Sequence, residues 1–264
     1  MRLAAALFAS CLWAQSPAPP LMEYQGKPVR LPAPCTEEDM QALGLDCSES
    51  RPCPLYLELA SIESSGSRVF LAGNIHTSDT TVYSVFLASE DGGKTWTEPA
   101  PRMRSAGLDQ IQFLDLECGW VAGHTLGAVP RDPFLLVTTD GGKTWRKRNV
   151  YPESRPGVIE AFWFESRTRG YMLLDRVQTG GEGARYEMYE TMTGGESWSL
   201  SEVSREPIKA RRPAQPDPEG RLWRIQVDAK TKAYRIEKRG ASGWQIAAEF
   251  LVETGVCGTA TAAQ

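Results

Sequence analysis

Histidine and closely paired cysteines are scarce in this chain of 264 residues. Its only histidines are His76 and His124, and no two cysteines have the Cys-x-x-Cys spacing. Structural zinc sites are built from four Cys or His ligands, commonly with that spacing. The sequence therefore predicts no metal site, and we expect no cofactor.

Basic charge and long apolar segments are also lacking. The 29 Lys and Arg are outnumbered by 33 Asp and Glu, which gives a net charge of −4. Proteins that bind nucleic acid need a surplus of basic side chains to neutralise phosphates. No segment approaches the ~20 apolar residues of a membrane helix, and no Gly-x-Ser-x-Gly motif follows a predicted strand. We therefore expect no nucleic-acid partner, no membrane span and no serine hydrolase site.

The amino terminus has the features of an export signal. Met1-Arg2 is a short positive start, residues 3–13 are apolar, and a polar, proline-rich stretch follows. Such a segment is too short to span a bilayer and is removed on export. We predict a signal peptide of residues 1–14, cleaved after Ala14, and a protein in the periplasm or outside the cell. In the alternative, the sequence ending at Cys11 is a lipoprotein box and Cys11 is lipid-anchored.

Residues 15–53 form a proline-rich segment that belongs to no repeat. Within it, residues 36–43 predict a short helix, capped by Thr36 and ended by Gly44. Exported chains allow disulfides, and the cysteines of this segment lie close enough in sequence to invite one. Five cysteines remain after export, so at least one is unpaired or intermolecular, and the sequence alone does not fix the pairing. The candidates for a disulfide are Cys35, Cys47 and Cys53.

A repeated turn organises the rest of the chain. Ser89 to Trp96 is SEDGGKTW, Thr138 to Trp145 is TTDGGKTW, and a third copy ending at Trp198 is TMTGGESW. The tryptophans are 49 and 53 residues apart, and repeats of this size are typical of solenoids, propellers or arrays.

Each copy predicts a hairpin turn between two strands. Glycine allows positive φ, an Asp side chain accepts hydrogen bonds from turn amides, and Trp packs against a neighbouring sheet. The third copy has Thr193 in place of the Asp, which indicates that the Asp is structural and not catalytic. The predicted structural residues of the turns are Asp91, Gly92, Gly93, Thr95, Trp96, Asp140, Gly141, Gly142, Thr144, Trp145, Gly194, Gly195 and Trp198.

The motif Ser-x-Asp-x-Gly-x-Thr-Trp resembles the Asp-box, or BNR repeat, of sialidase-like β-propellers. With the flanking Gly119-Trp120-Val121-Ala122-Gly123, the chain from about 54 to 204 resembles the photosystem II stability/assembly factor-like group of propellers. The resemblance implies a β-propeller, and the assembly factors imply transient binding of a protein or peptide. It marks a fold and not an activity, because hydrolases and binding proteins share the motif.

The expected fold is all-β: a propeller of four or five blades, each of four antiparallel strands, with the short N-terminal helix. The propeller should cover residues 54–252, and a C-terminal tail should follow at 253–264. Its fourth blade has only three good strands, and strands from the two chain ends commonly complete a propeller. The expected blades are residues 54–101, 107–150, 157–204 and 205–252.

Candidate binding residues lie in loops at strand ends. The two histidines follow equivalent strand ends and should share one face of the disc. Four charged residues between strands or blades are candidates for an anionic-peptide site, since Arg binds carboxylates well; the alternative is loop residues with local ion pairs. These residues are His76, His124, Arg102, Arg104, Arg131 and Asp132.

A sialidase-type hydrolase would need converging arginines, a Tyr–Glu pair and an acid. Arg30 lies in a segment that resembles the Arg-Ile-Pro motif, and Tyr–Glu neighbours occur at 186–187 and 189–190. Adjacent strand residues, however, point to opposite faces. We therefore predict an exported, non-enzymatic propeller that binds a protein or peptide. The alternative is a degenerate sialidase-like glycosidase or a carbohydrate-binding propeller.

Overall fold

The computed structural model describes residues 21–127, 129–176, 183–209 and 221–258. The expected signal peptide, its cleavage site at Ala14 and the alternative anchor Cys11 lie outside the described residues. No helix in the described part of the chain is long and apolar enough to cross a membrane.

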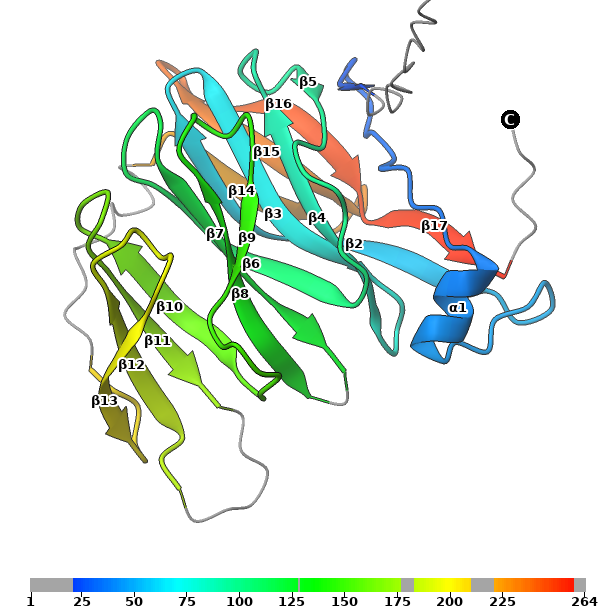
Figure 1. Ribbon diagram of the computed structural model, residues 1–264. Coiled ribbons are helices and arrows are strands. Elements are labelled where there is room, and N and C mark those ends of the chain that lie inside the picture. Colours follow the sequence, from blue (N-terminus) through cyan, green and yellow to red (C-terminus); the bar gives the residue numbers. More distant parts are fainter. Residues whose placement is uncertain (1–20, 128, 177–182, 210–220, 259–264) are drawn as a thin grey trace, which may run out of the picture.

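The described chain is built almost entirely of antiparallel strands (Figure 1). Consecutive strands pair with one another, which is the blade pattern of a β-propeller, and the expected fold class is confirmed. The first sheet contains β2 (Cys53–Ser65), β3 (Arg68–His76), β4 (Thr81–Ser89) and β17 (Glu253–Cys257). The second contains β6 (Ala106–Phe113), β7 (Gly119–Leu126), β8 (Pro130–Thr138) and β9 (Arg146–Asn149). The third contains β10 (Val158–Phe164), β11 (Gly170–Asp175), β12 (Tyr186–Thr191) and β13 (Ser199–Ser204). The fourth contains β14 (Trp223–Asp228), β15 (Ala233–Gly240) and β16 (Gly243–Leu251).

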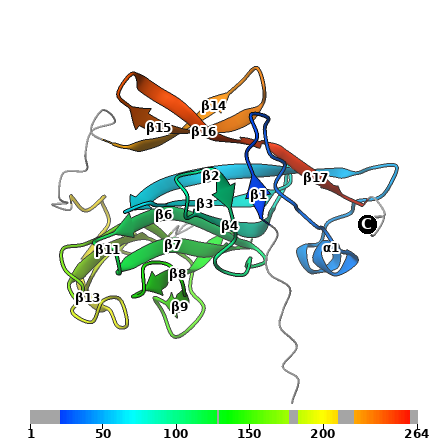
Figure 2. The ribbon, with the colours of Figure 1, turned by 90° about the horizontal axis from the view of Figure 1, so that it is seen from above.

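The sheets pack face to face in the order fourth, first, second, third (Figure 2). Each interface has its own apolar cluster of buried side chains. The third and fourth sheets lie at opposite ends of this row (Figures 1 and 2). Among the described residues, the four sheets therefore form an open row.

Both ends of the chain add to these sheets. β17 pairs with β2, so the expectation of a C-terminal tail is wrong for Glu253–Cys257. The small, polar residues there favoured a frayed end, but the Thr254 hydroxyl donates to the Leu55 carbonyl and Cys257 is disulfide-bonded. At the other end, Val29 forms a parallel bridge to Phe250 of the three-stranded fourth sheet. A further short strand, β1 (Met22–Glu23), pairs with β5 (Thr95–Trp96).

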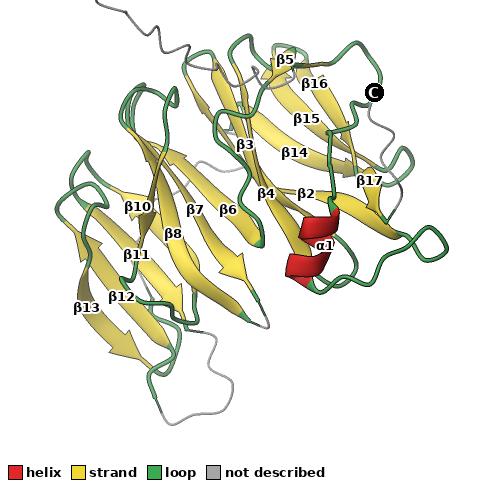
Figure 3. Ribbon diagram, turned by 45° about the vertical axis from the view of Figure 1, so that its right-hand side comes forward, coloured by secondary structure: helices red, strands yellow, loops and turns green. Residues whose placement is uncertain are grey.

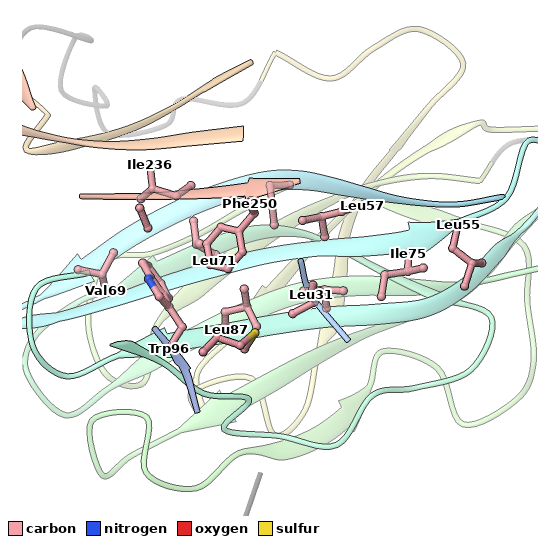
Figure 4. Packing of buried hydrophobic residues seen from close by; sticks show 14 of the residues in the cluster. Leu31, Leu55, Leu57, Val69, Leu71, Ile75, Leu87, Trp96, Ile236 and Phe250 are labelled. Carbon is pink, nitrogen blue, oxygen red and sulfur yellow. The ribbon is translucent and has the colours of Figure 1, made fainter. Parts of the chain in front are cut away.

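The largest apolar cluster lies between the first and fourth sheets (Figure 4). Leu71 and Phe250 contribute from the two sheets, and Leu31 comes from the N-terminal segment; all three are fully buried. Trp96 is also fully buried, and its ring meets Phe250 edge-on at 5.7 Å between centroids, a favourable aromatic geometry. The N-terminal segment thus completes the core between two sheets.

The repeated turns have the hydrogen bonds that their sequence predicts. In the first, Asp91 Oδ1 accepts from the Ser89 hydroxyl and from the amides of Lys94 and Thr95, while Oδ2 accepts from the Thr95 hydroxyl. Asp140 repeats this set in the second turn. In the third turn the Thr193 hydroxyl accepts from the Ser197 amide. One hydroxyl thus replaces part of the carboxylate network.

The first helix, α1 (Glu37–Leu43), begins and ends where its sequence predicts. Thr36 and Asp39 form a capping box, and Gly44 ends the helix in the left-handed conformation at φ 63°. Figure 3 shows α1 beside the end of the first sheet that lies opposite β5 and the repeated turns. The helix therefore marks the end of the sheets where a candidate site lies.

Candidate binding groove

A groove of about 820 Å³ lies between the α1 region and the ends of the first two sheets. One wall is formed by the end of α1 and the loop that follows it. The other wall is formed by the β3–β4 turn, the start of β6 and the end of β7. The lining residues are 42–46, 51–54, 78–80, 105, 126 and 127.

Disulfides hold the α1 wall in place. Cys47 pairs with Cys53 at the start of β2, and Cys35 pairs with Cys257 at the end of β17. The pairing that the sequence left open therefore joins the N-terminal segment both to itself and to the C-terminal strand. Two disulfides fit a protein that matures in an oxidising compartment. The remaining described cysteine, Cys118, is a buried free thiol, and burial raises its pKa.

A buried carboxylate fixes α1 to the first sheet. Asp39 is 1% exposed and accepts from Arg104 Nε at 2.9 Å. Burial and the hydrogen bond to Asp39 raise the pKa of Tyr83 on β4 to about 12. Preorganised walls reduce the entropy cost of binding.

The four strands that reach the groove lead into a polar cluster. We define the polar cluster as Glu58 of β2, Asn74 of β3, Asp109 of β6 and His124 of β7. Each member lies within a few residues of a groove-lining position on its own strand or at its end. Glu58 lies four residues after the groove residue Pro54 on β2, so these two side chains share a face of the strand.

Two hydrogen bonds organise this cluster. Asn74 Nδ2 donates to Glu58 Oε2 at 2.9 Å, and His124 Nδ1 lies 2.9 Å from Asp109 Oδ2. Asn74 and His124 are 9% and 7% exposed. The buried Asn74 Oδ1 has no hydrogen-bond donor among the described residues. Buried polar atoms are rarely left unpaired, so this oxygen is an acceptor with spare capacity.

β-Bulges place acidic side chains along the first strand of successive sheets. The register of β6 shifts at Asp109, and that of β10 shifts at Glu160. β2 has the same irregularity at Ala60, two residues after the exposed Glu58. Bulges redirect side chains and often lie beside functional sites. The second and third sheets thus carry a carboxylate at this bulge, and the first sheet has one two residues before it.

The structure places His76 and His124 differently from the sequence expectation. His76 ends β3 and its Nδ1 lies 2.7 Å from the Thr77 carbonyl, whereas His124 lies within β7. The register makes Asn74, not His76, the counterpart of His124, because each follows the glycine of an Ala-Gly pair. The spacing of 50 residues between Asn74 and His124, each after an Ala-Gly pair, is the sequence signal that identifies Asn74.

The candidate arginines do not converge on one anion site. Arg102 is paired with Glu98, and Arg104 is paired with Asp39 and Glu38. Asp132 accepts from Ser154 and from the Arg155 amide, which makes it a loop-stabilising residue. Arg131 Nε lies 3.6 Å from Asp132 Oδ2. Both Arg102 and Arg104 are thus occupied by carboxylates of the same chain.

A Tyr–Glu pair exists, but it joins residues two apart on one strand. Glu187 accepts hydrogen bonds from Tyr189 and Tyr151 at 2.8 Å each and from Arg176 Nη1 at 2.9 Å. Burial alone would raise the pKa of Glu187, but these donors hold it below its usual value. Glu187 is 5% exposed between the second and third sheets, and Arg30 follows Val29 beside the fourth sheet. The elements of a sialidase-type site therefore lie apart.

Within the described ranges, no group of three or more His, Cys, Asp or Glu is arranged to hold a metal ion. The fold and site together define an all-β, propeller-type protein with a disulfide-bounded groove at one end of its sheets.

Parts of the chain are similar to known proteins. No family model matches the chain. A stretch of 119 residues is 30% identical to the oligoxyloglucan-reducing end-specific xyloglucanase of Emericella nidulans, covering 44% of this chain and 14% of that enzyme. The chain therefore spans only a small part of this relative.

Among solved structures, the chain is similar to YCF48 bound to D1 peptide, with 21% identity, a TM-score of 0.40 and coverage of 74% of this chain and 54% of that one. It is also similar to the GH74 xyloglucanase of Xanthomonas campestris, with 18% identity, a TM-score of 0.36 and coverage of 51% and 18%. The α-L-arabinofuranosidase Arb93A of Fusarium graminearum gives 15% identity, a TM-score of 0.34 and coverage of 74% and 58%. Similarity at this level does not distinguish a binding protein from a hydrolase.

Proposed function

We propose that this chain is an exported, non-enzymatic β-propeller that binds an extended peptide segment of another protein in the groove. The supporting observation is the groove itself, whose volume of about 820 Å³ lies within the usual range for ligand sites of about 300–1,000 Å³. Its walls come from two sheets and a disulfide-held segment, so it needs no large rearrangement to admit a ligand.

We further propose that the repeated turns are Asp-boxes with a structural role. The Asp91 and Asp140 carboxylates are occupied by hydrogen bonds within their own turns. Figure 3 shows α1 opposite β5, which lies at the end of the sheets that carries the turns. This separation supports a division of the molecule into a turn end and a binding end.

Blocking the groove tests the peptide proposal. Ser78 is an exposed groove residue whose side chain forms no hydrogen bond with the described residues, and a tryptophan there would occupy part of the groove. Peptides would be selected from a random nonapeptide library on the purified chain, and their affinities measured by fluorescence anisotropy. We expect Ser78→Trp to weaken binding at least tenfold and the control Thr139→Trp, exposed at the turn end, to leave it unchanged. Unchanged binding by Ser78→Trp, or failure to select any peptide, would contradict the proposal.

A carbohydrate ligand is the second candidate. It is favoured by the 119-residue similarity to the Emericella nidulans xyloglucanase. Xyloglucan oligosaccharides would be tested by calorimetry with the same two variants. Binding that is lost in Ser78→Trp, without any peptide binding, would replace the peptide proposal, and release of shorter sugars would show an enzyme.

A further inference from the structure

We propose that the two disulfides form one thiol-reactive site, in which a small dissolved thiol opens Cys47–Cys53 and Cys53 then exchanges with Cys257. The supporting observation is the register of two strands, because β17 pairs with β2 so that Cys257 lies directly opposite Cys53. Each of these two cysteines is bonded to a cysteine of the N-terminal segment, Cys257 to Cys35 and Cys53 to Cys47. The exchange does not depend on what the groove binds.

The cross-strand position of Cys53 and Cys257 suits a disulfide between them. Residues directly opposite each other in an antiparallel pair have Cα atoms about 4.5–5.5 Å apart and side chains on the same face. Disulfides usually join Cα atoms about 4.4–6.8 Å apart. Cys47 also lies beside the end of β17, because a Cβ on Gly258 would be 3.0 Å from Cys47 Cβ and 2.7 Å from the Ser48 amide nitrogen. The two disulfides are therefore neighbours, and Cys53 is placed to attack the second bond.

The two bonds differ in their access to solvent. Cys257 is fully buried, whereas Cys47 and Cys53 are both partly exposed and Cys53 lines the groove. The loop between them, residues 48–52, is exposed throughout, so the Cys47–Cys53 bond can open without disturbing the apolar core. Exchange requires a thiolate to reach a disulfide sulfur, and exposed disulfides are the labile ones. A thiol from solution should therefore react first at Cys47–Cys53.

The exchange has two steps, each an attack of a thiolate on a disulfide sulfur. The thiolate of the small thiol attacks the Cys47 sulfur, a mixed disulfide forms at Cys47, and Cys53 leaves as a thiolate. The Cys53 thiolate attacks the Cys257 sulfur, the Cys53–Cys257 bond forms, and Cys35 leaves and takes up the proton that the small thiol lost. Two disulfides and one thiol are present before and after, so no oxidant or reductant is needed.

The exchange would remove the covalent link between α1 and β17. Cys35 directly precedes Thr36, the N-cap of α1, whereas the new bond would join β2 to β17. The ion pair of Asp39 with Arg104 would still hold α1 to the first sheet. A dissolved thiol would thereby release one wall of the groove from the C-terminal strand.

Cys47→Ser isolates the second step, because it leaves Cys53 as a free thiol opposite Cys257. The purified variant would be held at pH 8, blocked with N-ethylmaleimide and digested without reduction, and its bonds identified by mass spectrometry. We expect Cys53–Cys257 in at least a tenth of the molecules, with the blocking group on Cys35. Cys47→Ser/Cys53→Ser is the matched control and should keep Cys35–Cys257, with Cys35 unlabelled. An intact Cys35–Cys257 bond in Cys47→Ser, with label on Cys53 and none on Cys35, would overturn the inference.

The parent protein tests the first step and does not depend on whether Cys47→Ser folds. Reduced glutathione is the probe, and bonds are mapped over time. We expect the first product to carry glutathione on Cys47 together with a Cys53–Cys257 bond. The Cys35–Cys257 bond of the double variant should react at least tenfold more slowly than Cys47–Cys53 of the parent. Equal rates, or a first product with glutathione on Cys35 or Cys257, would contradict the proposed order. Neither measurement uses a groove ligand, so both are independent of the peptide proposal.

Discussion

Cys35 and Cys257 form a disulfide between residues 222 apart in the sequence. The bond joins the segment that precedes α1 to the last residue of β17, which pairs with β2. The two ends of the described chain are therefore fixed to the same sheet, and one wall of the groove depends on that connection.

The two disulfides should differ in their contributions to stability. Closing a long loop removes more entropy from the unfolded chain than closing a short one. By that relation, Cys35→Ser/Cys257→Ser should lower the free energy of unfolding by about 5 kcal/mol. Cys47→Ser/Cys53→Ser opens a loop between residues only 6 apart and should lower it by about 2 kcal/mol. Urea unfolding of both variants measures this. Equal losses would show that strain or residual structure, and not loop length, governs the effect.

The three turn tryptophans should rank by burial. Trp96 is 0% exposed and donates from Nε1 to the Gly93 carbonyl, whereas Trp145 and Trp198 are only partly buried. Trp96→Ala should lose about 3–5 kcal/mol through a large cavity. Trp145→Ala and Trp198→Ala should lower the free energy of unfolding by less. Chemical denaturation of the three variants measures these losses. A different order would show that the apolar cluster in Figure 4 is not the main contributor to stability.

The turn carboxylates should make stability fall in acid. Burial is the largest single influence on Asp91 and raises its pKa, but the hydrogen bonds from Thr95, Ser89 and Lys94 together outweigh it and lower the pKa to about 2. For Asp140, the Thr144 hydroxyl is the largest cause of a pKa of about 2. An unfolded Asp has a pKa of about 3.9, so this stabilisation is complete above about pH 4 and is lost as the pH falls towards 2.

The double variant Asp91→Ala/Asp140→Ala isolates that effect. Each substitution should cost about 0.5–2 kcal/mol at neutral pH through lost turn hydrogen bonds. The difference in free energy of unfolding between this variant and the parent protein should become smaller as the pH falls from 4 to 2. Thr193→Ala, in the turn without a carboxylate, serves as the control, and a difference that stays constant with pH would contradict the structural role of the two carboxylates.

Local features were predictable from the sequence and long-range ones were not. The turns at Asp91 and Asp140 and the helix cap at Thr36 depend on neighbours a few residues away, so their patterns specify them. The pairing of β17 with β2 and the Cys35–Cys257 bond depend on contacts across the whole chain, for which the small residues after Glu253 give no signal. The polar cluster lies between these cases, because strand alternation and the repeat spacing point to Asn74, but only the register shows its partner Glu58.

Glu187 should be the most sensitive buried carboxylate between the second and third sheets. It receives hydrogen bonds from Tyr151, Tyr189 and Arg176. Glu187→Ala removes the carboxylate partner of the Arg176 guanidinium, whose side chain is 24% exposed, and the acceptor shared by the Tyr151 and Tyr189 hydroxyls. Removing one partner of a fully buried ion pair costs about 3–5 kcal/mol, and the partial exposure of Arg176 puts the expected loss at the lower end of that range. Glu187→Gln keeps the shape and should cost less, and Glu202→Ala, on the exposed strand β13, should be nearly neutral. Thermal unfolding of the three variants tests this order. If Glu187→Ala unfolded like the parent protein, the Tyr–Glu–Arg cluster would not be a structural one, and its residues would then have to be tested for a chemical role.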